Sequence, residues 1–176
     1  MRLLLGVTGS VAAYKAAELA NRFTKDGHEV DVILTRAAAL FVTPLTFQTL
    51  TRRKVYTDLF GGFDATDVRH VSLAQGADLA LIAPATANLI GKLAGGLADD
   101  MLTTVLTAFY PKPALIAPAM NTAMYQNPIV QGNIAKLAGF GYRFIEPREG
   151  RLACGDCGKG ALAETGDIVR AVYEAV

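Results

Sequence analysis

Hydrophobic residues in this chain gather in four short, continuous runs that are spread along its 176 residues. The runs cover residues 3–8, 30–35, 79–84 and 114–118. None of them alternates polar and apolar positions, and such continuous runs are typical of parallel strands that helices cover on both faces. We therefore predict four buried parallel strands, with a further strand over residues 142–145.

Between these runs, apolar residues recur at helical spacing. Ser10 is a suitable N-cap for the first predicted helix, and Gly27 would end it. Asp99 and Asp100 suit the start of a later helix, because acidic groups are favourable near a helix N-terminus. The predicted helices cover residues 10–25, 88–93, 98–109, 128–137 and 166–176.

The alternation of strands and helices predicts an α/β fold: a doubly wound, open parallel sheet in three layers, flavodoxin-like or Rossmann-like. The length suits one domain over residues 1–176. In such sheets, ligands bind at the carboxyl ends of the strands. Small or polar residues follow each apolar run at this edge, and they predict one composite site: Gly9, Ser10, Thr35, Thr86, Asn88 and Asn121.

Composition narrows the choice of partners. Hydrophobic residues make up 52% of the chain and charged residues 19%, which suggests that some surface is buried against other subunits. The net charge of +1 gives no electrostatic footprint for nucleic acid. No apolar run is long enough to span a membrane, and the N-terminal run is too short for a signal peptide. We expect a cytoplasmic protein.

A glycine turn, residues 6–10, leads from the first strand into the first helix. Its backbone amides could hold a phosphate group, and Gly9 would let that group approach closely. The turn matches neither the dinucleotide fingerprint nor a Walker loop, so a mononucleotide such as FMN fits better than NAD or ATP. A purely structural turn is the alternative interpretation.

Two further features have both a functional and a structural interpretation. Residues 84–88, Pro-Ala-Thr-Ala-Asn, could lie along a flat ring or a ribityl chain, or could form only a proline turn with an N-cap. His70 precedes a predicted short helix. Imidazoles exchange protons near neutral pH, so His70 could act as an acid or base, although a lone histidine is often structural.

The two cysteines of the chain, Cys154 and Cys157, lie three positions apart. With no other cysteine present, a disulfide framework is excluded. A redox pair or half of a zinc site remain alternatives, but zinc would need two more ligands, and the histidines are not at finger spacing. Three glycines follow Cys154 within six residues, which favours a mobile loop in which Cys154 alone acts as a catalytic thiol. We predict no metal site.

Several motifs recur in an order that resembles the flavin-dependent cysteine decarboxylases, from residue 2 to the end of the chain. The motifs are GSVAAYK at 9–15, His70, PATAN at 84–88, GGLADD at 95–100, PAMN at 118–121 with Met124, and LACGD at 152–156. The combination of the PAMN and ACG motifs is highly specific for this family.

The resemblance implies site residues. It implies FMN as cofactor, held by Gly9, Ser10, Val11, Thr35, Thr86, Ala87, Asn88, Leu89 and Ala119. It implies that His70, Cys154 and Asn121 take part in the chemistry, and that the substrate is contacted by Asn121, Met124, Arg151 and Ala153. It also implies a homo-oligomer, a trimer or a multiple of trimers, with the flavin at a subunit interface.

The resemblance further implies a lyase of coenzyme A biosynthesis. The reaction would be FMN-dependent oxidative decarboxylation of 4'-phosphopantothenoylcysteine to 4'-phosphopantetheine, through thioaldehyde and enethiol intermediates. Cys154 would supply the last proton and His70 would act as a base. The alternatives are a sister enzyme that acts on cysteine-ended peptides, a flavin prenyltransferase of the same fold, and a flavin-binding regulatory subunit without turnover.

Overall fold

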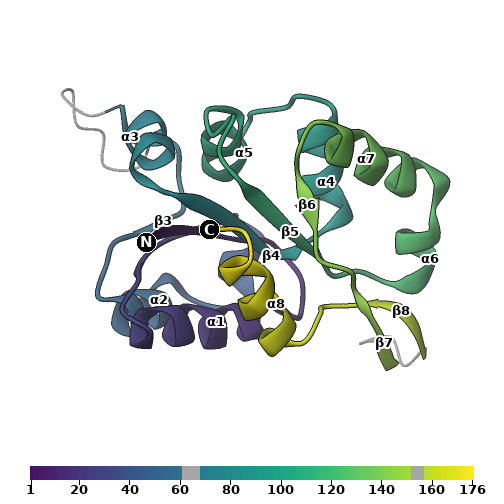
Figure 1. Cartoon of the computed structure of the whole chain (residues 1–176), viewed down its shortest axis with the longest axis horizontal. Helices are drawn as coiled ribbons and strands as arrows, with labels where there is room; N and C mark the ends of the chain where they lie inside the picture. The colour runs from purple at the N-terminus through teal and green to yellow at the C-terminus, as the bar shows by residue number, and fades with distance from the viewer. Residues whose placement is uncertain (61–67, 152–156) are drawn as a thin grey trace.

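A computed structural model describes residues 1–60, 68–151 and 157–176 (Figure 1). Its centre is a parallel sheet with the strand order β3-β2-β1-β4-β5-β6. The strands are β1 (Arg2–Val7), β2 (Glu29–Leu34), β3 (Val55–Tyr56), β4 (Leu79–Ala85), β5 (Ala114–Pro118) and β6 (Arg143–Phe144). This is the strand order of a Rossmann-type, doubly wound sheet, and it reverses direction between β1 and β4.

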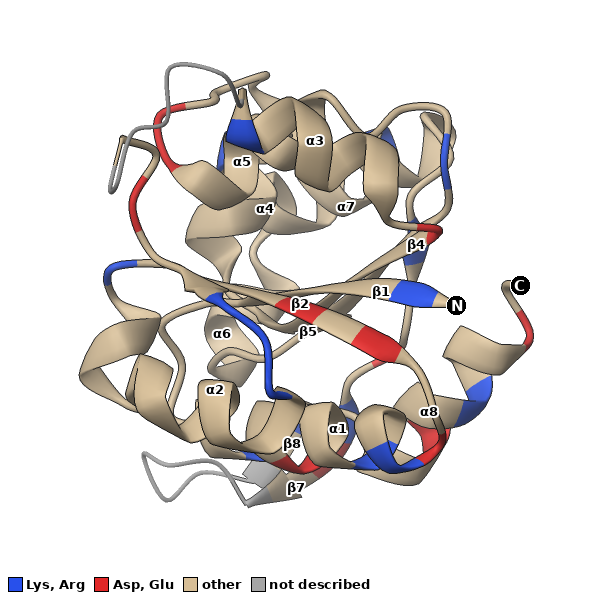
Figure 2. Cartoon of the chain, turned by 90° about the vertical axis from the view of Figure 1, so that its left-hand side faces the viewer, with Lys and Arg blue, Asp and Glu red and all other residues tan. Residues whose placement is uncertain are grey.

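Helices cover both faces of the sheet, so the predicted three-layer α/β fold is confirmed (Figures 1 and 2). One layer consists of α1 (Ala13–Lys25), α2 (Pro44–Thr51) and α8 (Thr165–Tyr173). The other layer consists of α3 (Arg69–Gly76), α4 (Ala87–Ala94), α5 (Met101–Thr107) and α7 (Pro128–Gly139). Smaller elements lie near the ends of the strands: the 3-10 turn η1 (Ala38–Leu40), α6 (Thr122–Gln126), and a hairpin of β7 (Arg148–Arg151) and β8 (Cys157–Ala161).

The central strands are buried on both faces, which explains their continuous apolar sequence. Along β1, Leu3 and Leu5 belong to the hydrophobic core beneath α1 and α8. Leu4, between them, belongs to the second core beneath α3, α4 and α5. All three side chains are at most 1% exposed, and burial of a leucine stabilises the fold by about 1.5–3 kcal/mol.

The five predicted strands are present, as are the five helices whose bounds were predicted and the short helix predicted after His70, but some boundaries differ. The first helix begins at Ala13 and not at Ser10, so the prediction that Ser10 is its N-cap is wrong. Ser10 instead begins a turn that precedes the helix, in which its carbonyl oxygen accepts from the Ala13 amide at 2.9 Å. The helix predicted to begin at residue 98 starts at Met101, where Asp100 is the N-cap.

Candidate active site

The turns after β1 and β2 touch each other at the carboxyl edge of the sheet. A Cβ atom placed on Gly9 would lie 2.4 Å from the Cβ atom of Ala37, so no larger residue fits at Gly9 without moving one of the turns. Thr35 directly follows β2, and its amide donates to the carbonyl oxygen of Val7 at 3.0 Å. The structure therefore brings Gly9 and Thr35 to the same place, as the sequence predicted.

Thr8 joins this pair of turns to the turn that follows β4. Its side-chain hydroxyl donates to the carbonyl oxygen of Pro84 at 2.7 Å and accepts from the amide of Thr86 at 3.0 Å. The residue is 2% exposed, and its bond to Pro84 is buried, whereas the bond from Thr86 is partly buried. The sequence pattern indicates only that Thr8 ends an apolar run, and it predicts no role for this hydroxyl.

The segment after β4 starts helix α4 and presents small side chains at the same edge. Thr86 is the N-cap, and its hydroxyl accepts from the amide of Leu89 at 3.4 Å. Ala87 is partly exposed and Asn88 is exposed, so both can contact a ligand. The side chain of Leu89 is only 2% exposed and packs in the second core, which leaves its backbone as the part that can face a ligand.

The segment after β5 places Ala119 and Asn121 next to these turns. The Ala119 amide donates to the carbonyl oxygen of Ala85 at 2.9 Å. Asn121 is the N-cap of α6, and its side-chain oxygen accepts from the amide of Ala123 at 2.8 Å. This bond fixes the orientation of the Asn121 amide, two residues from the edge where Ala119 lies. Met124, one helical turn further, is 48% exposed.

The β7–β8 hairpin packs against the Asn121 turn. The Met120 amide donates to the carbonyl oxygen of Gly160 at 2.9 Å. Gly160 has φ = 149°, and a Cβ atom there would lie 2.4 Å from the carbonyl oxygen of Met120, so this close approach requires glycine. A Cβ atom on Gly158 would likewise lie 2.4 Å from the hydroxyl of Thr122. The hairpin is thereby held beside α6.

The hairpin also carries three predicted site residues. Arg151 is the last residue of β7 and is paired with Cys157 in the antiparallel register. Ala153 and Cys154, and the side chain of Arg151, lie outside the described residues. Their predicted roles therefore remain predictions.

His70 lies apart from the other candidate residues. It is half-buried in the first turn of α3, whereas the sequence had suggested a position just before a helix. Figure 1 shows α3 and α6 at opposite ends of the molecule. One chain therefore brings together the glycine turn, Thr35, the α4 start and Asn121, but does not bring His70 to Asn121.

An ion pair holds the GGLADD turn between α4 and α5. The Lys92 ammonium lies 2.7 Å from the Asp99 carboxylate and 3.4 Å from that of Asp100. The hydrogen bond between Lys92 and Asp99 raises the pKa of Lys92 and lowers the pKa of Asp99, so both stay charged at neutral pH. Asp100 also caps α5 by accepting from the Thr103 amide at 2.8 Å. The turn is thus fixed from both helices.

The site offers a glycine turn, backbone groups at the start of α4 and small side chains at Ala87 and Ala119. A glycine turn from a strand into a helix suits a phosphate, and small side chains allow a flat ring to approach the backbone. Among the described residues, no group of three or more His, Cys, Asp or Glu side chains is placed to hold a metal ion. None of the helices described has the length and apolar character needed to cross a membrane.

Comparison with known proteins agrees with this arrangement. Residues 1–176 match the Flavoprotein family. A probable phosphopantothenoylcysteine decarboxylase of Streptococcus mutans is 48% identical over 174 residues, which are 98% of this chain and 97% of that protein. The coenzyme A biosynthesis bifunctional protein CoaBC of Bacillus subtilis is 52% identical over 168 residues, which are 96% of this chain but only 41% of that longer protein.

Solved structures give the same result. A cysteine-to-serine variant of PPC decarboxylase, complexed with pantothenoylaminoethenethiol, has a TM-score of 0.86 and 38% identity, with 98% of each chain covered. The FMN-binding protein AtHal3 has a TM-score of 0.84 and 37% identity, covering 99% of this chain and 97% of its own. The chain belongs to the flavoprotein family, in the group of the phosphopantothenoylcysteine decarboxylases.

Proposed function

We propose that residues 1–176 form one decarboxylase domain that converts 4'-phosphopantothenoylcysteine to 4'-phosphopantetheine with FMN as cofactor. The 48% identity to the Streptococcus mutans relative, over nearly the full length of both chains, supports this substrate. The observation that carries the proposal is that Ala119 and Asn121 lie only two residues apart, directly after β5. This arrangement joins the edge that suits a flavin to an oriented amide that suits a substrate carboxylate.

The residues at the carboxyl edge fit FMN. The Gly9–Ser10 turn would receive the phosphate, and Thr86, Ala87 and Asn88 would lie along the ribityl chain or the ring. At Gly9 the absence of a side chain lets the first two turns meet. When bound, FMN supplies reversible hydride transfer, which protein side chains cannot provide.

Such a cofactor is needed because direct loss of carbon dioxide from a cysteine amide would leave an unstabilised carbanion. Acid–base groups contribute only about 10²–10⁴-fold to a reaction rate. We infer that the cysteine β-carbon first loses a hydride while its thiol loses a proton, giving a thioaldehyde. The electrons of the C–CO₂ bond then pass into an enethiolate. One proton at the carbon that lost the carboxyl group and return of the hydride to the β-carbon give the saturated thiolate, and a second proton on sulfur gives the thiol.

The ligand of the solved PPC decarboxylase variant supports an enethiol stage. That protein carries a cysteine-to-serine change and is complexed with pantothenoylaminoethenethiol, an unsaturated thiol. By analogy, we propose that Cys154 supplies the proton of the last step and that His70 acts as base. Arg151, Ala153 and Met124 would contact the substrate.

Asn121 suits the departing carboxyl group for an electrostatic reason. Its amide can donate a hydrogen bond to a carboxylate without adding a full positive charge. A strong salt bridge would stabilise the carboxylate in the ground state and so oppose its loss. The bond from the Ala123 amide to the Asn121 side-chain oxygen supports this role, because it fixes which way the amide faces.

We also propose that the enzyme is cytoplasmic and works as a homotrimer, or a multiple of trimers, with each site between two copies. The separation of His70 from Asn121 in one chain supports a shared site. Exposed apolar side chains near the glycine turn support a subunit contact there: Val11 (55% exposed), Tyr14 (63%), Leu40 (86%), Phe41 (54%) and Leu45 (69%).

Mixing of two inactive variants tests the shared site. His70→Asn and Asn121→Asp subunits would be unfolded and refolded together at equal amounts. If each site takes His70 from one copy and Asn121 from another, random assembly leaves about one quarter of the sites intact. If both residues act within one chain, no site is intact and the mixture stays inactive.

The substrate is tested with the FMN-loaded protein and two compounds, 4'-phosphopantothenoylcysteine and a cysteine-ended peptide. We expect carbon dioxide from the first and little from the second. Faster turnover of the peptide would instead identify the protein as a peptide-cysteine decarboxylase. Flavin binding without turnover of either compound would assign a regulatory role.

A further inference from the structure

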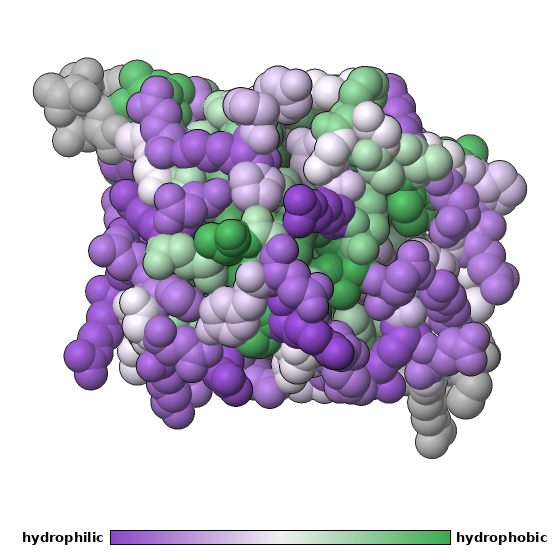
Figure 3. Space-filling view, in the orientation of Figure 1, coloured by the Kyte–Doolittle hydropathy of each residue, from purple (hydrophilic) through white to green (hydrophobic). Residues whose placement is uncertain are grey.

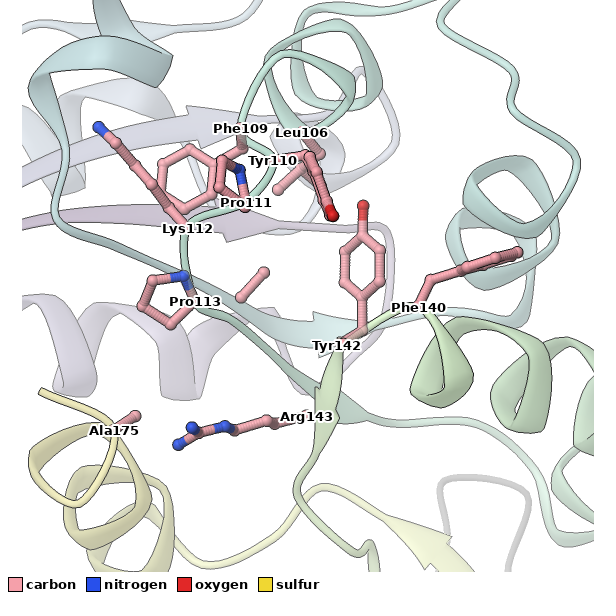
Figure 4. A pocket seen from close by; sticks show the side chains of 12 residues that line it. Leu106, Phe109, Tyr110, Pro111, Lys112, Pro113, Phe140, Tyr142, Arg143 and Ala175 are labelled. Carbon is pink, nitrogen blue, oxygen red and sulfur yellow. The ribbon is translucent and has the colours of Figure 1, made fainter.

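A pocket of about 510 Å³ lies at the edge of the sheet opposite the candidate active site (Figure 4). Residues 106–114, from the end of α5 to the start of β5, form one side of it. Residues 140–143, from the end of α7 to the start of β6, and Ala175 complete it. The pocket meets β5 at its first residue, Ala114, whereas the candidate active site follows the last residue of that strand. The two sites are therefore separate.

Four aromatic residues are among those that line the pocket: Phe109, Tyr110, Phe140 and Tyr142. Tyr110 is 82% exposed and Phe140 is 65% exposed, so both rings are accessible to a ligand. Figure 4 shows the Tyr142 ring standing in the pocket with its hydroxyl directed toward Tyr110. Figure 3 shows apolar surface between hydrophilic side chains over the middle of this face. These rings offer flat surfaces on which another ring can stack.

The charges of the pocket are all positive. Its lining contains Lys112 and Arg143 but no Asp or Glu. The Lys112 ammonium is already used, because it donates to the carbonyl oxygens of Ala74, Gln75 and Ala77 at 2.6–2.9 Å, and in Figure 4 it points away from the other side chains. Arg143 is therefore the cation that a ligand could contact. Its side chain runs along the pocket toward Ala175 (Figure 4).

Arg143 and Tyr142 supply the polar groups that a ligand would need. Arg143 forms no salt bridge within the described residues and projects from β6, an edge strand of the sheet. A guanidinium binds phosphate or carboxylate through two parallel hydrogen bonds. Burial raises the pKa of Tyr142, so its hydroxyl stays protonated and can donate a hydrogen bond.

We propose that this pocket binds a planar aromatic anion of the purine nucleotide class, with the base against Tyr110, Phe140 and Tyr142 and the phosphate on Arg143. The volume is within the range of about 300–1,000 Å³ that small-molecule sites have. Stacking on aromatic rings together with a guanidinium–phosphate pair is a common way in which proteins hold nucleotides. The site is independent of the proposed decarboxylation.

Isothermal titration of the FMN-loaded protein with three probes tests the proposal. AMP carries both the ring and the charge, adenosine only the ring, and inorganic phosphate only the charge. We expect saturable binding of AMP, and binding of each partial probe that is weaker by at least about tenfold. The FMN spectrum and the rate of decarboxylation serve as separate readouts of the active site.

Substitutions in the pocket test whether AMP binds there. Arg143→Gln and Tyr110→Ala should each weaken AMP binding by about tenfold or more, and Tyr142→Phe should weaken it less, because the ring is kept. Arg170→Gln is the matched control: Arg170 is an exposed arginine that pairs with Asp167 on α8, and its loss should change nothing. All four variants should still bind FMN.

Four results would overturn the proposal. AMP does not bind to the FMN-loaded protein at millimolar concentration, or Arg143→Gln binds it as well as the unmodified protein does, or AMP binds only when FMN is absent. A change in sedimentation on Tyr110→Ala, without AMP binding, would instead assign this face to a contact between copies and would equally overturn it.

Discussion

The hydroxyl of Thr8 donates a hydrogen bond to the carbonyl oxygen of Pro84 at 2.7 Å, across 76 positions of sequence. Thr8 directly follows β1, and Pro84 is the last residue but one of the neighbouring strand β4. The order of the sheet reverses between these two strands. Ligands of doubly wound sheets bind where this reversal opens a crevice. Thr8 therefore holds together the two turns on which the proposed FMN site depends.

Removal of the Thr8 hydroxyl should loosen that site. In Thr8→Val, the carbonyl oxygen of Pro84 and the amide of Thr86 each lose a buried partner, and we expect a loss of about 1–3 kcal/mol in the free energy of unfolding. The FMN dissociation constant should rise in parallel. Flavin fluorescence on titration and denaturant unfolding measure the two effects.

Thr51→Val is a matched control for that prediction. Thr51 is also buried, and its hydroxyl also donates to a carbonyl oxygen, that of Phe47, and accepts from an amide, that of Arg53. Its replacement should lower stability but leave FMN affinity unchanged. Equal loss of FMN affinity in both variants would mean that Thr8 acts only through stability.

Gly9→Ala should disturb the meeting point of the first two turns. The new Cβ atom would lie 2.4 Å from that of Ala37, so one turn must move. We expect the dissociation constant of FMN to rise by at least about tenfold, which corresponds to about 1.4 kcal/mol. Gly132→Ala, where a Cβ atom meets nothing within 4 Å, is the control and should bind FMN normally. Unchanged affinity in Gly9→Ala would remove this turn from the cofactor site.

Asn121→Asp should block turnover while FMN stays bound. Aspartate can still cap α6 by accepting from the Ala123 amide, but its negative charge repels the substrate carboxylate. We expect kcat to fall by about 10²–10³-fold, the usual effect of losing one key donor. Asn127→Asp is the matched control, because Asn127 caps α7 by accepting from the Ile129 amide. This variant should remain active. Full activity of Asn121→Asp would contradict the assignment.

Cys154→Ser should separate the early and late steps of the reaction. Serine is a far weaker acid than cysteine, so carbon dioxide should still be released but the saturated thiol should form about 10²–10⁴-fold more slowly. Mass spectrometry would then show an unsaturated thiol product. A normal yield of 4'-phosphopantetheine would exclude Cys154 from the last step.

The sequence predicted the sheet well because burial on both faces leaves a direct pattern: every residue of β4 is buried, and its sequence is apolar throughout. The position of ligand sites at the carboxyl ends of strands then predicted Gly9, Thr35, Thr86 and Asn121. The helix α2 was not predicted, because only Phe47 and Thr51 of its eight residues are buried, which leaves no clear periodicity.

Other features depend on contacts between distant segments and leave no local signal. A threonine that ends an apolar run does not show that its hydroxyl will join two turns, as that of Thr8 does. Nor does a serine before a helical pattern show whether it caps the helix or lies in a turn before it, as Ser10 does. The distance between His70 and Asn121 follows from which ends of the sheet their helices cover.

The central proposal is tested most directly with 4'-phosphopantothenoylcysteine that carries carbon-13 in its carboxyl group. With the FMN-loaded protein, we predict one labelled carbon dioxide for each 4'-phosphopantetheine formed, and neither product with flavin-free protein. Failure of the FMN-loaded protein to release the label, or equal release without flavin, would contradict the account.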